Sequence, residues 1–281
     1  MLTVCPTPIG NLQDLTPRQR EALTSADVIA CEDTRTTGKL LERLGISRET
    51  TRLVSYHDHN AQQRAQELLE VLRAGRRVTL VSDAGTPTIS DPGYRLVQAA
   101  SQAGHPITAL PGPVAALTAL SASGLPSDRF FFEGFLPQKQ QARLARLHQL
   151  KPLGVTLLCY ESPHRLARAL EDVVTVFGAD LVVCVGRELT KMHEEYVRGP
   201  AQQVAQEFAG RERVRGECVL ILAAPEQGEA RLEGEALDAR IQELLAQGHR
   251  TKVVRDMLST QTALASSALY ERIEALKRSA R

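Results

Sequence analysis

The segment Val78-Thr-Leu-Val-Ser-Asp-Ala-Gly-Thr-Pro-Thr-Ile-Ser-Asp-Pro-Gly93 joins a short apolar run to a dense group of turn-forming residues. The run from Val78 to Val81 is rich in β-branched residues and predicts a buried strand. Apolar Leu96, Val97 and Ala100 then indicate a helix. In an open α/β sheet, ligands bind at the carboxyl ends of strands. We therefore interpret the intervening loop as a binding loop, with a tight surface turn as the alternative.

This loop lacks the two common nucleotide-binding patterns. It contains neither G-x-x-x-x-G-K-[ST] nor G-x-G-x-x-G, so it is neither a nucleotide-triphosphate loop nor the usual dinucleotide loop. Pro87 and Pro92 stiffen the path of the chain, which lowers the entropic cost of holding one shape. The sequence thus predicts a rigid loop of another kind.

Composition limits the possible partners. The chain has 281 residues, 43% of them hydrophobic, which suffices for two domains or for one large domain with an appendage. The net charge of +1 gives no global attraction for nucleic acid, so any such binding needs a local patch. No apolar run has the length of a membrane span and no signal peptide is evident, so we expect a soluble, cytoplasmic protein without a membrane partner. Five widely spaced cysteines without C-x-x-C spacing predict neither disulfides nor a metal site.

Strand, loop and helix alternate through residues 1–113, which predicts an N-terminal α/β domain with a mostly parallel sheet. Besides the run at 78–81, short strands are expected at 2–5, 28–31, 54–56 and 107–110. Three loops after these strands are rich in proline and glycine: Pro6 to Gly10, Asp83 to Pro87, and Pro111 to Pro113. Since parallel strands place such loops at one edge of the sheet, we expect them to line one cleft.

The remaining sequence predicts two further domains. Residues 114–225 contain strand-like runs at 155–160, 181–185 and 219–222 and an edge strand at 197–199, which indicates a second α/β domain that completes the cleft. Pro225 to Gly234 has the composition of a linker. Apolar spacing in residues 235–281 predicts a C-terminal domain of three short helices, which serves either as a helix-turn-helix-like RNA contact or as packing at a subunit contact.

Eight short motifs, in order along the chain, resemble those of the bacterial 16S rRNA (cytidine-2'-O)-methyltransferases, a family with the tetrapyrrole-methylase fold. The resemblance runs from about residue 3 to residue 222. The motifs are Thr7-Pro-Ile-Gly-Asn-Leu12, Glu32-Asp-Thr-Arg35, Val81-Ser-Asp-Ala-Gly-Thr-Pro87 with Ser90-Asp-Pro-Gly93, Leu110-Pro-Gly-Pro113, Ser123-Gly-Leu-Pro126, Gly134-Phe-Leu-Pro137, Tyr160-Glu-Ser-Pro-His-Arg165 and Arg187-Glu-Leu-Thr-Lys191.

The resemblance implies S-adenosylmethionine as the methyl donor, bound in a cleft between two α/β domains, usually within a homodimer. It implies transfer to the ribose 2'-oxygen of a decoding-centre cytidine of 16S rRNA in the small ribosomal subunit. Asp83 then offsets the positive charge of the donor, or simply caps a turn, and backbone near Glu217 holds the adenine. By analogy, the donor contacts are Pro8, Ile9, Asp83, Gly85, Thr86, Pro113, Val114, Tyr160 and Glu217.

Charged residues at strand ends are candidates for catalysis and for phosphate binding. We favour Lys191, with Glu188 and Glu32, because a desolvated lysine whose pKa is lowered can act as a base; structural ion pairs are the alternative. Three arginines that can hold phosphates bidentately are Arg35, Arg165 and Arg187.

No acidic residue occurs from Gly134 to Tyr160, and Arg143 and Arg146 lie three residues apart, which would place them on one face of a helix. We expect this pair to bind rRNA, with a solvated helix face as the alternative.

Two other functions fit the same fold. One is methylation of a small tetrapyrrole-like metabolite, although a macrocycle would favour a more apolar cleft than these charged strand ends provide. The other is a non-enzymatic RNA-binding factor, which would have no need of the methyl donor. The fold alone does not separate these functions.

Overall fold

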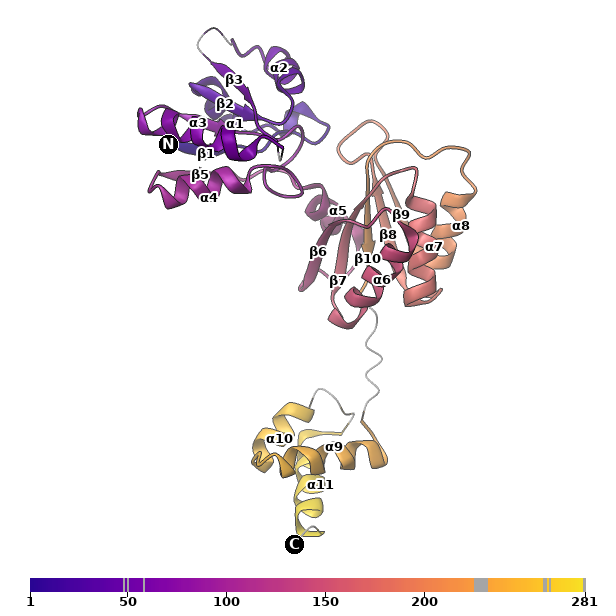
Figure 1. Ribbon diagram of the computed structural model, residues 1–281. Coiled ribbons are helices and arrows are strands. Elements are labelled where there is room, and N and C mark those ends of the chain that lie inside the picture. The colour runs from indigo at the N-terminus through magenta and orange to yellow at the C-terminus, as the bar shows by residue number, and fades with distance from the viewer. Residues whose placement is uncertain are drawn as a thin grey trace. The chain divides into compact units, whose positions relative to one another are not determined.

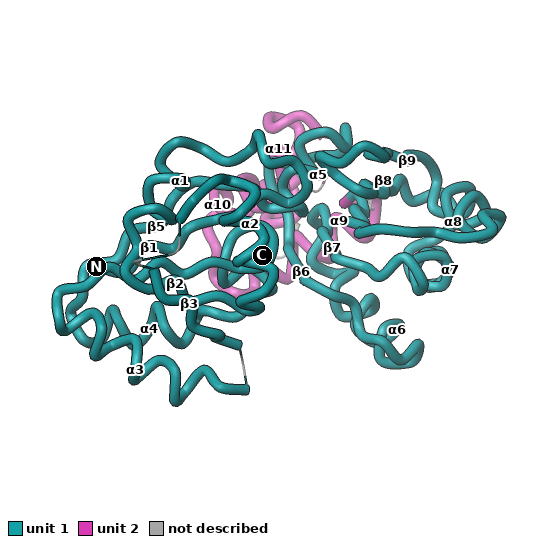
Figure 2. The backbone as a smooth tube through the Cα atoms, turned by 90° about the horizontal axis from the view of Figure 1, so that it is seen from above, with its two compact units in different colours: residues 1–223 teal, residues 224–281 magenta. Residues whose placement is uncertain are grey.

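The structure is a computed structural model of the 281-residue chain. It describes residues 1–47, 49, 51–57, 59–224, 232–259, 262 and 264–279. The chain forms two compact units, residues 1–223 and 224–281, which Figure 2 colours separately. Each is described by itself below. The predicted linker, Pro225 to Gly234, lies mostly outside the described residues, as does the predicted domain end at residue 225.

The first unit begins with a five-stranded, fully parallel sheet in the order β3-β2-β4-β1-β5 (Figure 1). The predicted parallel sheet within residues 1–113 is confirmed, with strand ends that differ by one or two residues. Its strands are β1 (Leu2–Val4), β2 (Val28–Cys31), β3 (Arg52–Ser55), β4 (Val78–Leu80) and β5 (Ile107–Ala109).

Helices cover both faces of this sheet. The helices are α1 (Pro17–Thr24), α2 (Thr34–Arg43), α3 (Ala61–Arg73) and α4 (Tyr94–Gln102), with a short 3-10 helix at Leu12–Asp14. Buried leucines of α3 and α4 pack with β4 in one apolar cluster, whereas those of α1 and α2 pack with β2 in another. Helix α1 begins at Pro17, directly after a reciprocal capping box formed by Thr16 and Gln19. Burial on both faces explains the continuous apolar strands.

The second half of the unit is a mixed five-stranded sheet in the order β6-β7-β10-β8-β9. Only β6 and β7 are parallel; the other neighbours are antiparallel. The predicted edge strand near residue 197 is confirmed as β9, whereas β6 was not predicted. The strands are β6 (Phe130–Phe135), β7 (Thr156–Glu161), β8 (Val182–Arg187), β9 (Glu195–Pro200) and β10 (Cys218–Leu222).

This sheet carries three helices on one face and one on the other. Helices α6 (Gln140–Leu150), α7 (Leu166–Phe177) and α8 (Ala201–Ala209), with a 3-10 turn at Lys151–Leu153, enclose the larger apolar cluster. Helix α5 (Ala115–Ser123) packs on the opposite face, where Ala119 and Leu120 contact the sheet. Ile9, from the loop after β1, belongs to the same cluster. The first sheet's loops therefore reach the α5 face of the second sheet.

The described residues of the second unit form three helices, as predicted: α9 (Gly234–Ala246), α10 (Thr251–Leu258) and α11 (Ser266–Ser279). They share a core that includes Ile241, Leu258 and Ile273. Val253 and Met257 of α10 are exposed.

All five cysteines are buried and unpaired. Within the described residues, no helix is long and apolar enough to cross a membrane.

Candidate functional site

Three loops of the first sheet meet at one edge. Thr7 and Gly85 exchange two backbone hydrogen bonds, with N–O distances of 2.9 and 3.0 Å. The Thr86 hydroxyl donates to the carbonyl oxygen of Pro113 over 2.9 Å. The loops after β1, β4 and β5 are therefore directly joined, which confirms the predicted convergence at the carboxyl ends of the strands.

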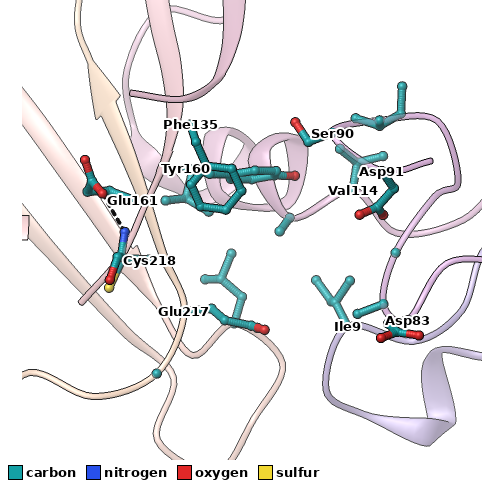
Figure 3. Close-up of a pocket in the computed structure, with 18 of the residues that line it drawn as sticks. Ile9, Asp83, Ser90, Asp91, Val114, Phe135, Tyr160, Glu161, Glu217 and Cys218 are labelled. Carbon is teal, nitrogen blue, oxygen red and sulfur yellow. Dashed lines mark hydrogen bonds between the residues drawn. The ribbon is translucent and has the colours of Figure 1, made fainter. Parts of the chain in front are cut away.

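These loops form one side of a cavity of about 410 Å³, and the second sheet forms the other side (Figure 3). Seven of the nine predicted donor contacts line the cavity: Ile9, Asp83, Gly85, Thr86, Val114, Tyr160 and Glu217. Pro8 and Pro113 do not line it, although the Pro113 carbonyl fixes Thr86 at its wall.

Backbone strain gathers in two loops beside the cavity. Among the described residues other than glycine, positive φ occurs at Thr88 (76°) and Ser90 (60°) in the loop after β4, and at Glu188 (51°) and Thr190 (64°) after β8. Such conformations cost of order 1–3 kcal/mol each and persist only where the surroundings fix them. Both loops are thus held in definite shapes around the cavity.

Two carboxylates line the cavity on the side of the first sheet. Burial raises the pKa of Asp91 to about 6, with a further contribution from the negative charge of Glu32. Burial also raises the pKa of Asp83, although a hydrogen bond from the Asp33 backbone N–H, 3.2 Å long, partly offsets this. The site is therefore suited to a cationic ligand, since a nearby positive charge favours the ionised carboxylates.

The opposite wall presents a tyrosine and a helix start. The Ala116 N–H donates to the Tyr160 hydroxyl over 3.4 Å, and burial raises the pKa of that hydroxyl. Val114 and Ala115, at the N-terminus of α5, also line the cavity. Backbone N–H groups at a helix N-terminus favour an anionic ligand group.

Lys191 and Glu188 do not line the cavity, but Lys191 lies between the carboxylates of Glu188 and Glu217, and Glu217 does line it. Its Nζ is 2.8 Å from Glu188 Oε1 and 3.0 Å from Glu217 Oε2. Burial alone would lower the pKa of Lys191, but the hydrogen bonds to both carboxylates outweigh it and raise that pKa above its ordinary value. The expected lowering of this pKa is therefore wrong. In this structure Lys191 is a cation that holds Glu217 at the cavity wall.

The loop that carries Lys191 contacts the first sheet's loops closely. A Cβ atom at Gly10 would lie 2.5 Å from Lys191 Cγ, so only glycine permits this approach. The Asn11 N–H also donates to Thr190 Oγ1 over 3.2 Å. The two halves of the site are thus fixed to each other at this point.

Glu32 and Arg35 lie near the site but do not line the cavity. Glu32 follows β2 and acts on Asp91 through its charge. Arg35, whose side chain is 86% exposed, lies 2.9 Å from Asp33. The bidentate hydrogen bond from Arg35 lowers the pKa of Asp33 to about 2. Arg35 is therefore accessible to a ligand outside the cavity.

The predicted RNA-binding pair in the acid-free segment is not supported by the structure. The Arg143 side chain is only 3% exposed and lies 2.6 Å from Asp172 on α7, with further bonds to the carbonyls of Pro137 and Gln138. The expectation for Arg143 is therefore wrong, because the guanidinium is a buried structural group. Arg146 lies on the same helix and pairs with Glu133 at 2.7 Å.

The other two predicted phosphate ligands are also engaged within the protein. Arg187 lies 2.8 Å from Glu195 and donates to the carbonyls of Arg215 and His193. Arg165 pairs with Glu161, and its Nε and Nη1 are buried without a hydrogen-bond partner in the structure. Neither guanidinium presents the open fork that a bidentate phosphate contact requires.

Several cavity residues were absent from the predicted site. Asp91 was interpreted only as a turn former, yet its place in the Ser90-Asp-Pro-Gly93 motif was a usable signal. Phe135 depends on β6, which was not predicted. The main additions are Ser90, Asp91, Phe135, Glu161, Leu189 and Cys218. Among the residues that the structure describes, no group of three or more acidic, histidine or cysteine side chains could hold a metal ion.

Several solved structures share this fold. The methyltransferase CobJ superposes with a TM-score of 0.59 at 23% identity, covering 79% of this chain and 93% of CobJ. Diphthine synthase gives a TM-score of 0.61 at 15% identity, covering 79% of this chain and 89% of that one. The uroporphyrin-III C-methyltransferase of Thermus thermophilus, solved in complex with S-adenyl homocysteine, gives 0.52 at 18% identity and covers 79% of this chain and 96% of that one.

Sequence comparison is more specific. The chain is 45% identical over 273 residues to the ribosomal RNA small subunit methyltransferase I of Vibrio cholerae serotype O1, covering 96% of this chain and 93% of that protein. It is 48% identical over 237 residues to the Escherichia coli O157:H7 protein of the same name, with 84% and 82% covered. A family model of the tetrapyrrole (corrin/porphyrin) methylases matches residues 1–205. The chain therefore belongs to the tetrapyrrole methylase family and, within it, to the family of the ribosomal RNA small subunit methyltransferases I.

Proposed function

We propose that this protein transfers a methyl group from S-adenosylmethionine to the ribose 2'-oxygen of a decoding-centre cytidine in 16S rRNA of the small ribosomal subunit. Two observations support a ribosomal substrate: the relatives at 45 and 48% identity carry the name ribosomal RNA small subunit methyltransferase I, and they align over most of this chain. The observation that carries the proposal is the cavity, where three joined loops place two carboxylates opposite an apolar wall.

The cavity suits the proposed donor. Its volume of about 410 Å³ lies within the range of small-molecule sites. The donor has a cationic sulfonium centre, which the carboxylates of Asp83 and Asp91 would attract, and a carboxylate tail, which the start of α5 at Ala115 would accept. The backbone from Gly216 to Val219 also lines the cavity and offers an edge for the adenine.

When bound, the donor supplies an electrophilic methyl group on a positively charged sulfur. The protein must align the ribose 2'-oxygen with that methyl and remove the hydroxyl proton. Good alignment alone is worth roughly 7–11 kcal/mol. The rigid loops after β4 and β8 provide it, because their strained residues hold one shape on both sides of the cavity.

We assign removal of the proton to Asp91. Its carboxylate lines the cavity, and a pKa of about 6 makes it a stronger base than an ordinary aspartate while leaving it ionised at neutral pH. The new C–O bond forms as the S–C bond breaks, and the hydroxyl proton moves to an Asp91 carboxylate oxygen. A base contributes about 10²–10⁴-fold to the rate.

Lys191, Glu188 and Glu217 have a supporting role in this proposal. Because the pKa of Lys191 is raised, the ammonium stays protonated and does not act as the base. It instead fixes the carboxylate of Glu217 at the cavity wall through the 3.0 Å contact. Glu188 holds the ammonium from the other side at 2.8 Å.

We further propose a cytoplasmic homodimer. The edge strand β6 exposes Phe131, which is 36% accessible in the single chain and lies on the face of the sheet opposite Phe135. An exposed aromatic side chain on an edge strand is typical of a surface that another chain covers. Analytical ultracentrifugation tests this proposal: a dimer is expected, and a monomer at micromolar concentration contradicts it.

Donor binding and methyl transfer test the function. We expect calorimetry to detect one S-adenosylmethionine per chain, and labelled donor to transfer its methyl group to purified small subunits that lack the modification. Asp91→Asn should keep the donor affinity within about tenfold but lower the transfer rate by about 10²–10⁴-fold. A protein that binds small subunits but not the donor would be a non-enzymatic binding factor and would contradict the proposal.

A further inference from the structure

An exposed phenylalanine lies at the wall of the cavity, on the edge strand of the second sheet. Phe135 lines the cavity and is 60% exposed, compared with 38% for Ile89, whereas Ile9 and Leu189 of the same wall are buried. A large apolar side chain that lines a binding cavity and still faces solvent is available to a ligand that enters from outside.

Phe135 is aimed at the cavity by a β-bulge. Phe132 pairs with Leu158, and Phe135 pairs with Tyr160, but the register shifts by one residue between Phe132 and Gly134. Side chains alternate along a strand, so without the extra residue Phe135 would point to the opposite face from Phe132. The bulge places both rings on the face that carries Tyr160.

The bulge depends on two neighbours. Glu133, the extra residue, pairs with Arg146 of α6 at 2.7 Å, which holds it on the far face of the sheet. Gly134 has φ of +75°, and a Cβ atom there would lie 3.1 Å from Ser90 Oγ, in the loop after β4. Both features keep β6 close to the strained loop and fix the direction of Phe135.

Three aromatic rings pack against one another beside the cavity, with their planes inclined by 73° and 60°. The ring centroids of Phe132 and Tyr160 are 5.1 Å apart, and those of Phe135 and Tyr160 are 5.5 Å apart. Figure 3 shows Phe135 beside Tyr160, across the cavity from Asp91. The inner two rings are partly buried and give Phe135 a fixed support, so its open face is a rigid apolar surface.

We propose that Phe135 stacks against the base of the target nucleotide. This inference rests on the proposed function, because it places the RNA substrate at the same cavity. A 2'-oxygen and its base are attached to adjacent ribose carbons, so a nucleotide whose 2'-oxygen faces Asp91 carries its base to the nearby wall. Enzymes that modify single nucleotides take them out of the helical stack. Unstacked bases bind to aromatic side chains.

The donor's adenine is the other flat group that could contact Phe135. It is disfavoured because the interior wall of the cavity, with Leu189 and Val219 buried, already offers an enclosed apolar position beside the Gly216–Val219 backbone. An enclosed wall suits a ligand that binds the enzyme first. The exposed ring suits a group that arrives with the RNA.

The test compares Phe135→Leu with Phe130→Leu. The control residue is also an exposed phenylalanine of β6 but does not line the cavity. We expect Phe135→Leu to raise the KM for small subunits by about 5- to 100-fold, the range expected for loss of one base stack. The donor Kd of Phe135→Leu should stay within about twofold of the wild-type value. Phe135→Tyr, which keeps an aromatic ring, should have a KM close to that of the wild type. Phe130→Leu should leave the KM unchanged.

A second measurement does not depend on turnover. The photoreactive amino acid p-benzoylphenylalanine at position 135 should crosslink to the target nucleotide of 16S rRNA in the small subunit, and at position 130 it should not.

Other results overturn the inference in distinct ways. A matching rise in donor Kd for Phe135→Leu would assign the ring to the donor's adenine. A change in oligomeric state for this variant would assign it to a subunit contact. An unchanged KM for Phe135→Leu, or a crosslink to another nucleotide, would contradict the base contact. The proposed function would still stand if the wild-type protein transferred a methyl group to small subunits. A wild-type protein that transfers no methyl to small subunits would overturn both.

Discussion

The hydroxyl of Thr86 donates a hydrogen bond of 2.9 Å to the carbonyl oxygen of Pro113, and this bond joins the loops that follow β4 and β5. These strands are not neighbours, since β1 lies between them in the sheet. The loop after β1 is joined to the same group by the paired hydrogen bonds between Thr7 and Gly85. One wall of the cavity is thus a single hydrogen-bonded unit built from three separate segments.

Removing this bond should loosen the wall. We expect Thr86→Val to lower the free energy of unfolding by about 1 kcal/mol, because the side chain keeps its shape but loses one hydrogen bond. Donor affinity should fall several-fold as the loops separate. Chemical denaturation and calorimetry measure the two effects. Thr175→Val is the control, since Thr175 donates to Glu171 on the exposed side of α7 at 3.0 Å and should leave donor affinity unchanged. Equal donor affinities in both variants would contradict the role of Thr86.

Donor affinity should depend on pH through Asp91. Burial and the charge of Glu32 raise its pKa to about 6, so the carboxylate is ionised above that pH and neutral below it. A cationic donor binds the ionised form better, and we expect Kd to rise by about tenfold between pH 7.5 and pH 5, as for a shift of one pKa unit. Calorimetry across this range gives the curve. In Asp91→Asn the curve should be nearly flat; a curve as steep as that of the wild type would assign the dependence to Asp83, whose pKa is also raised.

The charge state of Lys191 leads to a prediction that distinguishes a structural cation from a catalytic base. Arginine keeps a positive charge but does not deprotonate near neutral pH, so it can replace a structural cation and cannot replace a lysine base. We expect Lys191→Arg to keep at least about a tenth of the methyl-transfer rate and Lys191→Met to lose more, because Glu188 and Glu217 then lack their shared partner. A loss of about 10²–10⁴-fold in the arginine variant would restore the base role for Lys191.

Arg143 should matter for folding and not for RNA binding. Its guanidinium is buried against Asp172, and removing one partner of a buried pair costs about 3–5 kcal/mol. We expect Arg143→Met to lower the free energy of unfolding by this amount, as measured by urea denaturation. The salt dependence of small-subunit binding should remain that of the wild type, since no phosphate contact is lost. Lys139→Met, at the exposed start of α6, is the control for stability. A flatter salt dependence for the Arg143 variant would contradict this account.

The sequence was sufficient to locate the first sheet and its loops. Proline and glycine after short apolar runs mark strand ends, and parallel strands bring such ends together. That reasoning needs only local pattern and one rule of topology, and it located the three loops. The individual donor contacts Ile9, Asp83, Gly85 and Thr86 were implied by the family resemblance. It did not need the packing of side chains.

The predictions that were wrong or missing share one physical cause. Each depends on a partner residue that lies far away along the chain. An acid-free segment suggested that Arg143 was available, but Asp172 reaches it from another helix. The pKa of Lys191 depends on Glu188 and on Glu217, and Glu217 lies just before β10, far away along the chain. Phe135 faces the cavity only because of a bulge in β6, and the one local sign of that bulge in the sequence is the glycine at position 134, whose φ in the structure is +75°. Interactions of this kind are set by the tertiary fold.

The most direct test of the central claim is to map the methyl group after the reaction. Small subunits that lack the modification are incubated with the protein and labelled S-adenosylmethionine, and nucleosides from 16S rRNA are identified by mass spectrometry. The account predicts label on the 2'-oxygen of a single decoding-centre cytidine, and its loss in Asp91→Asn. Label on a base atom or at another nucleotide, or no label despite donor binding in the cavity, would contradict it.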